Sequence, residues 1–64
     1  MGLENAIEDS YDNHINDIYK ILSEAILLAN GDETEITTAE SKFKKGLAHA
    51  EDIRLRARRL AGLD

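Results

Sequence analysis

The sequence predicts an all-α protein in which two long helices pack as an antiparallel helical hairpin and form a single domain over residues 1–64. Proline is absent, so no residue forces a break inside a helix. The strongest break signal is Asn30-Gly31, within the stretch ANGDETEITT, and it divides the chain into nearly equal halves. In both halves the apolar residues recur at alternating steps of three and four, which is the heptad spacing of packed helices.

The first helix is expected over about residues 4–29. Asn30-Gly31 predicts its end, because glycine readily adopts the left-handed conformation of a helix C-cap. The turn is then expected over about residues 30–37 and the second helix over about residues 38–61. The predicted start of the second helix is the capping box Thr37-Thr38-Ala39-Glu40, whose side chains can accept hydrogen bonds from opening-turn amides. A short turn makes the helices antiparallel neighbours.

Each predicted helix carries one seam of apolar residues. The seam of the first helix comprises Tyr11, Ile15, Ile18, Leu22, Ala25 and Ala29. The seam of the second comprises Ala39, Phe43, Gly46, Ala50, Ile53, Ala57 and Leu60. Because the second seam contains several small residues, we expect the helices to approach closely and to cross at a shallow angle.

The first helix has more apolar surface than one partner helix can cover. Further apolar residues flank its seam on both sides, and the stretch ILSEAILLA would leave a large apolar patch on a lone hairpin. A chain of 64 residues without cysteine has no disulfide or thiolate zinc site to stabilise so small a core. We therefore predict a homodimer that forms a four-helix bundle, with a larger protein as the alternative partner. The predicted interface comprises Tyr19, Ile21, Leu22, Ile26, Leu28, Phe43, Leu47 and Ile53.

Charge is divided along the sequence. The chain is acidic, with a net charge of −5, yet the bases gather after residue 40 and most acids precede it. In an antiparallel hairpin the acidic start of the first helix lies beside the basic end of the second, which predicts ion pairs between them. The acids concerned are Glu4, Glu8, Asp9 and Asp12, and the bases are Arg54, Arg56, Arg58 and Arg59.

The same four arginines are the candidate contacts for a polyanion. In outline the predicted dimer resembles the Rop family of plasmid copy-number repressors, which are short antiparallel hairpins that dimerise and bind paired RNA loops. The likeness is architectural and carries no Rop motif, so it assigns no RNA-binding residue here. On the solvent face of the second helix, acids interrupt the bases every two turns, whereas a phosphate-tracking surface needs a continuous basic stripe. We expect no nucleic-acid ligand, and an RNA-binding regulator stays as an alternative.

His14 and His49 are candidate metal ligands, and each begins an H-x-x-D-I sequence whose aspartate, Asp17 or Asp52, could join them. The hairpin would bring the two histidines within about one helical turn of each other. The order differs from the Glu-x-x-His of dimetal bundles, so a metal-binding bundle is the weakest alternative. The sequence has no nucleophile elbow, glycine-rich phosphate loop or catalytic triad, and we expect neither enzymatic activity nor a cofactor. The sequence contains no cysteine, no targeting segment and no run of ~20 apolar residues that could cross a membrane. We therefore expect a cytoplasmic protein that does not enter membranes.

Overall fold

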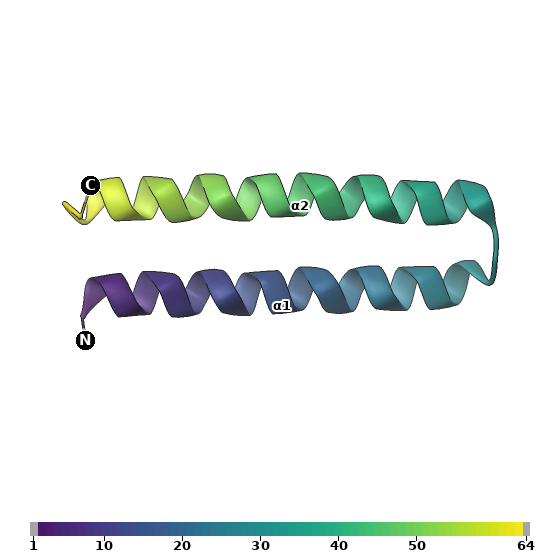
Figure 1. Ribbon diagram of the computed structural model, residues 1–64, viewed down its shortest axis with the longest axis horizontal. Helices are drawn as coiled ribbons and strands as arrows, with labels where there is room; N and C mark the ends of the chain where they lie inside the picture. The colour runs from purple at the N-terminus through teal and green to yellow at the C-terminus, as the bar shows by residue number, and fades with distance from the viewer. Residues whose placement is uncertain (1, 64) are drawn as a thin grey trace.

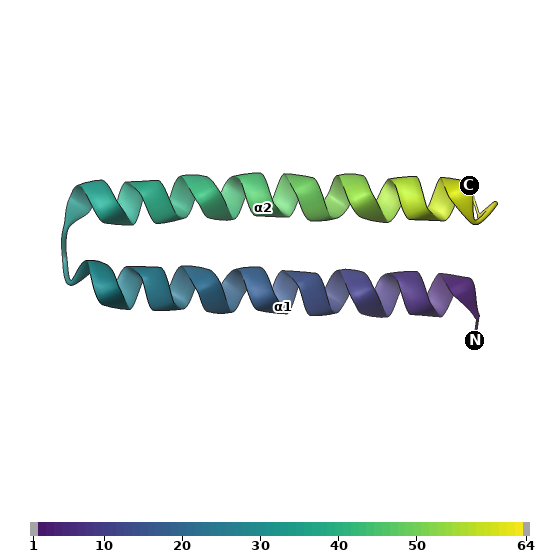
Figure 2. The same cartoon turned by 180° about the vertical axis from the view of Figure 1, so that it is seen from behind.

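The computed structural model describes residues 2–63 and consists of two helices, α1 (Leu3–Ala29) and α2 (Glu33–Leu60). The helices lie side by side and run in opposite directions, as seen from both sides of the molecule (Figures 1 and 2). The start of α1 therefore lies beside the end of α2, at what we call the open end, and the turn lies at the other end. The predicted all-α antiparallel hairpin is confirmed.

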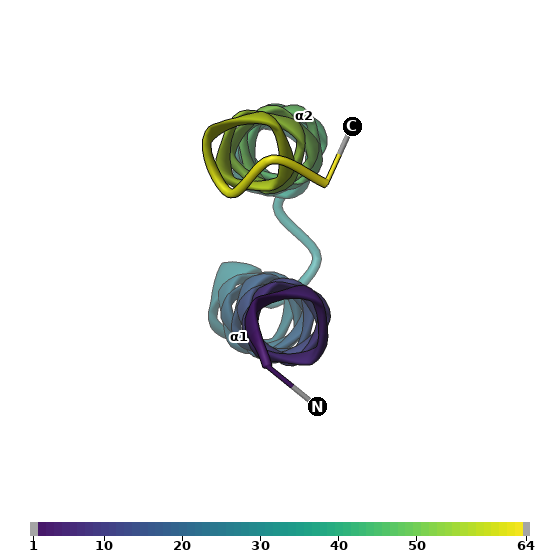
Figure 3. The same ribbon diagram turned by 90° about the vertical axis from the view of Figure 1, so that its left-hand side faces the viewer.

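The hairpin is elongated and consists of a single layer of helices (Figure 3). Its Cα atoms extend over 45 × 17 × 8 Å and have a radius of gyration of 14.7 Å. A compact domain of this length would have a radius of gyration of about 11 Å. Each helix therefore covers one stripe of its neighbour and leaves the rest of its surface open. Within residues 2–63, neither helix is long and apolar enough to cross a membrane.

The turn is shorter than predicted, because α2 begins at Glu33 and not near residue 38. The N-cap is Asp32, whose Oδ1 accepts a hydrogen bond from the backbone N–H of Glu35 at 3.0 Å. The acidic residues that follow it in the first turn also favour a helix start, because they face the positive end of the helix dipole. The proposed capping box at Thr37 is wrong: that region is already helical, and the Thr38 hydroxyl donates to the Thr34 carbonyl at 3.0 Å.

The end of α1 agrees with the predicted break at Asn30-Gly31. Asn30 is the C-cap and adopts the left-handed conformation, with φ 49° and ψ 46°. Its backbone N–H donates to the carbonyl of Leu27 at 3.2 Å. Gly31 follows with a φ of 87°, which glycine adopts without a steric penalty. Two successive residues of positive φ reverse the chain within three residues, and this tight reversal sets the helices side by side.

The contact between the helices buries few side chains. The buried apolar residues are Ile18, Ala29, Ala39 and Ala50, and no large side chain of the described residues is completely enclosed. All six residues of the predicted α1 seam are buried or half-buried, which confirms that seam. Because three of the four buried residues are alanines, the hairpin by itself has a narrow core with little apolar volume.

The seam of α2 departs from the heptad pattern in its last turns. Ile53 and Leu60 belong to that pattern but are 45% and 88% exposed. Arg54 and Arg58 face α1 in their place and are half-buried. An α-helix has 3.6 residues per turn, whereas a heptad assumes 3.5, so the inward face of a straight helix drifts by ~20° per heptad. By the last turns of α2, this drift has moved the inward position from the heptad residue to the residue that follows it, as from Ile53 to Arg54.

Gly46 of α2 faces the side chain of Ile18 on α1. A Cβ atom at this position would lie 3.4 Å from Cδ1 and Cγ2 of Ile18, which is ordinary van der Waals contact. Glycine also lowers the stability of a helix interior by about 1 kcal/mol relative to alanine. We therefore expect Gly46→Ala to raise the free energy of unfolding by up to about 1 kcal/mol, measured by urea denaturation followed by circular dichroism. Lower stability in this variant would show that the helices approach more closely than described.

Candidate interaction surface

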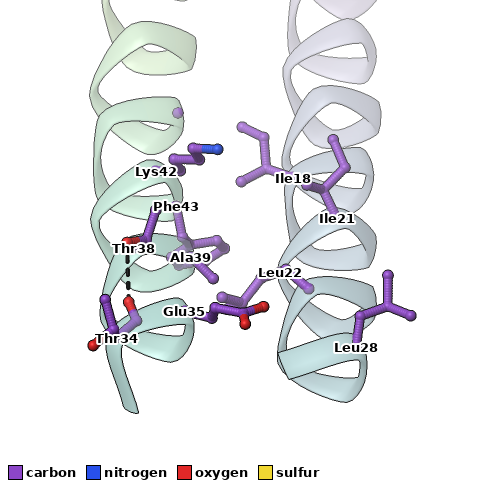
Figure 4. A pocket seen from close by; sticks show the side chains of 12 residues that line it. Ile18, Ile21, Leu22, Leu28, Thr34, Glu35, Thr38, Ala39, Lys42 and Phe43 are labelled. Carbon is purple, nitrogen blue, oxygen red and sulfur yellow. Dashed lines mark hydrogen bonds between the residues drawn. The ribbon is translucent and has the colours of Figure 1, made fainter. Parts of the chain in front are cut away.

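An apolar groove runs between the helices near the turn (Figure 4). It has a volume of about 600 Å³. Ile18 and Leu22 project from α1 toward α2, while Glu35 and Lys42 project from α2 toward α1. The lining residues from α1 are Ile18, Ile21, Leu22, Ala25 and Leu28, and those from α2 are Thr34, Glu35, Thr38, Ala39, Lys42, Phe43 and Gly46. The walls are therefore mostly apolar, with one acid and one base at the rim.

A second, smaller groove of about 290 Å³ lies nearer the open end. Its walls include Ile7 and His14 of α1 and Ile53 of α2. Ile7, His14, Ile21 and Leu28 are spaced seven residues apart, so they follow one row that rotates by only ~20° per heptad. Since Ile21 and Leu28 line the first groove and Ile7 and His14 line the second, both grooves open on the same side of the hairpin.

We call this side the docking face and define it by two rows of residues. The α1 row comprises Ile7, His14, Ile21 and Leu28, and the α2 row comprises Glu35, Lys42, His49 and Arg56. Glu35 and Lys42 line the first groove together with the α1 row, and His49 contacts His14, so the two rows share one side of the molecule. The docking face therefore combines an apolar row with a polar one.

The predicted interface residues divide between two sides of the hairpin. Ile21, Leu22, Leu28 and Phe43 come together in the first groove, and Ile53 lines the second. Tyr19, Ile26 and Leu47 line neither groove. In heptad register these three lie on the opposite flank of the seam, so the chain does not gather all eight residues into one surface.

Sequence reasoning missed Ile7 as a member of this surface. Ile7 stands one heptad before His14, in the same register as Ile21 and Leu28. Extending the flanking row upstream by seven residues would have identified it. Glu35 was also missed, because the predicted turn extended through residue 37 and so excluded it from the second helix.

Glu8 receives hydrogen bonds from two arginines at the open end. The Nε of Arg54 donates to both Glu8 carboxylate oxygens, at 2.9 and 3.0 Å. The Nη1 of Arg58 donates to Glu8 at 3.1 Å and reaches Glu4 at 3.4 Å. These contacts confirm the predicted pairing of acids from the first helix with bases from the second.

The ion pairs shift the titration of both partners. The hydrogen bond from Arg54 is the main reason that the pKa of Glu8 lies below its ordinary value, although partial desolvation acts in the opposite direction. The same hydrogen bond raises the pKa of Arg54. Arg54 also reaches Glu51 of its own helix at 3.3 Å, and its guanidinium carbon lies 5.4 Å from the centre of the Tyr11 ring. Arg54 is thus held by several contacts within the hairpin.

The remaining members of the predicted charge cluster point outward. The Nε of Arg56 donates to Asp52 of its own helix at 2.8 Å. Arg59 is exposed, and among residues 2–63 neither it nor Asp9 or Asp12 forms an ion pair. Only two of the four arginines therefore bridge the helices, because the rotation of α2 turns the other two away from α1.

The two histidines converge as the sequence predicts. The rings of His14 and His49 lie 6.0 Å apart between centroids, in an edge-to-face arrangement with an interplanar angle of 83°. A structural metal site needs three or four protein ligands. In the described part of the chain, no group of three or more histidine, cysteine, aspartate or glutamate side chains could hold a metal ion. One hairpin thus supplies two of the ligands that such a site requires.

The chain was also compared with known proteins. No protein-family model, curated protein or solved structure matches it.

Proposed function

We propose that this chain is a small, non-enzymatic interaction or regulatory protein that acts through a homodimeric four-helix bundle. The observation that carries the proposal is the imbalance between its buried and exposed apolar side chains. Among residues 2–63, Ile18 is the only large apolar residue that is buried, whereas Leu28 of the docking face is 79% exposed. A second hairpin would cover this surface and would enlarge the narrow core.

The size of the hairpin suits such an interface. Its broad side measures 45 by 17 Å between Cα atoms, or about 770 Å². A specific protein–protein interface buries about 800 Å² on each partner. One face of the hairpin is therefore large enough for a stable dimer without any further segment.

We further propose that the arginines serve the hairpin and not a nucleic acid. Arg54 and Arg58 donate to acids of α1, and Arg56 donates to Asp52. A phosphate backbone would have to compete with these carboxylates for the guanidinium groups. Replacing Glu8 tests this assignment, because it removes a carboxylate that accepts hydrogen bonds from both bridging arginines.

The dimer can be tested with a double variant of the docking face. We expect Ile21→Ser with Leu28→Ser to lower the sedimentation coefficient to that of a monomer. The matched control is Leu27→Ser, because Leu27 is 78% exposed but lines neither groove. That variant should remain dimeric. Dissociation of both variants alike, or of neither, would contradict the assignment of the interface to the docking face.

A further inference from the structure

We infer that a second copy of this chain docks on the docking face in an antiparallel orientation, with the turn of each hairpin against the open end of the other. The inference rests on the proposed dimer and specifies its geometry. It comes from the different chemistry of the two rows. The α1 row is apolar apart from His14, whereas the α2 row carries Glu35 near the turn and Arg56 near the open end.

Contacts inside the hairpin show which residues lie level with one another along its length. Ile18 packs on Gly46, His14 contacts His49, and Glu8 pairs with Arg54. In these pairs the two residue numbers add up to between 62 and 64. The two rows are therefore level throughout. The level positions are Leu28 with Glu35, Ile21 with Lys42, His14 with His49, and Ile7 with Arg56.

A parallel dimer would match these rows poorly. Its two-fold axis would run along the helices, so α1 of one copy would lie on α2 of the other and turn would lie beside turn. Leu28 would then face Glu35 of the second copy, and Ile7 would face Arg56. Each contact would bury an apolar side chain against a charged one, and the charges would lose water without gaining an ionic partner.

An antiparallel dimer matches both rows at their ends. Its two-fold axis would cross the middle of the hairpin, so α1 would lie on α1 of the second copy and α2 on α2. Leu28 would face Ile7 of the second copy, which places apolar side chains together. Glu35 would face Arg56 of the second copy, which joins opposite charges at two equivalent places. Lys42 would face His49 and Ile21 would face His14, and neither of these contacts adds charge attraction.

Both members of the charged pair are accessible for this contact. Glu35 is exposed at the rim of the first groove. Arg56 is exposed as well and uses its Nε for Asp52, and a guanidinium group has two further nitrogens that can donate. Contacts within the hairpin therefore leave donors on Arg56 for a carboxylate of the second copy.

The orientation can be measured with a single spin label, because the chain contains no cysteine. In Glu33→Cys carrying a nitroxide, the two labels of an antiparallel dimer lie at opposite ends. We expect double electron–electron resonance to give a separation approaching the 45 Å length of the hairpin. A parallel dimer would give a much shorter separation, because its two α2 helices would lie diagonally across the bundle, about 11–14 Å apart between their axes. A label at Asp17→Cys, level with the two-fold axis, should give a short distance and serves as the control.

A charge swap provides an independent test. We expect Glu35→Arg and Arg56→Glu each to raise the dimer dissociation constant by about 2- to 30-fold, measured by sedimentation equilibrium. The double variant should recover most of this loss, because it restores opposite charges at the contact. If the protein is dimeric, a short separation between the labels at position 33 would overturn the antiparallel orientation alone. So would a double variant that dimerises no more tightly than the single variants. A monomer in all measurements would overturn the proposed function as well.

Discussion

Replacing Ile18 with alanine is expected to lower the free energy of unfolding by about 2–4 kcal/mol. Ile18 is 9% exposed and is the only large side chain among the apolar residues that are buried within residues 2–63. It packs over Gly46, which has no side chain that could move into the space left by the substitution. The result would be a cavity in the middle of the hairpin. Urea denaturation followed by circular dichroism measures the change.

The size of this effect matters because small domains have little stability to lose. A core of this size rarely provides more than about 3–5 kcal/mol, so Ile18→Ala should be largely unfolded at moderate temperature. Leu27→Ala is the control, because Leu27 is exposed and packs in neither groove. If the two variants lose equal stability, the contact of Ile18 with α2 cannot be the centre of the core.

Replacing Glu8 with glutamine is expected to lower the thermal midpoint at pH 7. Glutamine removes the charge that Arg54 and Arg58 share and leaves these two neighbouring cations to repel each other. Thermal unfolding by circular dichroism at low ionic strength measures the change, and added salt should reduce it. Asp9→Asn is the matched control, since Asp9 neutralises neither arginine. An equal loss in both variants would reject a specific role for Glu8.

The same pair predicts a pH dependence. The pKa of Glu8 is lower in the folded protein than its ordinary value of 4.5. Its contribution to stability is therefore complete above about pH 4.5 and is lost as the pH falls through the folded value. The wild-type protein should lose stability in this range more steeply than Glu8→Gln, which cannot titrate there. Parallel curves for the two proteins would contradict the ion pair.

The sequence predicts the hairpin well because its main signals are local. The heptad spacing identifies the α1 seam, and Asn30-Gly31 identifies the end of that helix. The start of α2 was misplaced because Thr37-Thr38-Ala39-Glu40 and Asp32-Glu33-Thr34-Glu35 carry the same kind of capping signal. The helix begins at the first of these signals, with Asp32 as its N-cap, directly after the left-handed residues Asn30 and Gly31. This earlier start adds hydrogen-bonded helical turns to α2.

The sites were harder to predict because they depend on how the helices rotate. A strict heptad places Ile53 inward and Arg54 beside it, whereas the drift of a straight helix reverses them. That rotation selects Arg54 and Arg58 as the partners of Glu8 and turns Arg56 outward toward the docking face. No single residue type indicates this rotation, because the rotation accumulates over the whole length of α2.

The central claim is that the hairpin functions as a homodimer, and the most direct test is its molar mass in solution. Multi-angle light scattering should be recorded over a range of protein and salt concentrations. We predict a mass of twice the 7.1 kDa of one chain, stable on dilution through the micromolar range. A mass of one chain at all concentrations would contradict the claim, because the apolar row of the docking face would then have no second copy to cover it.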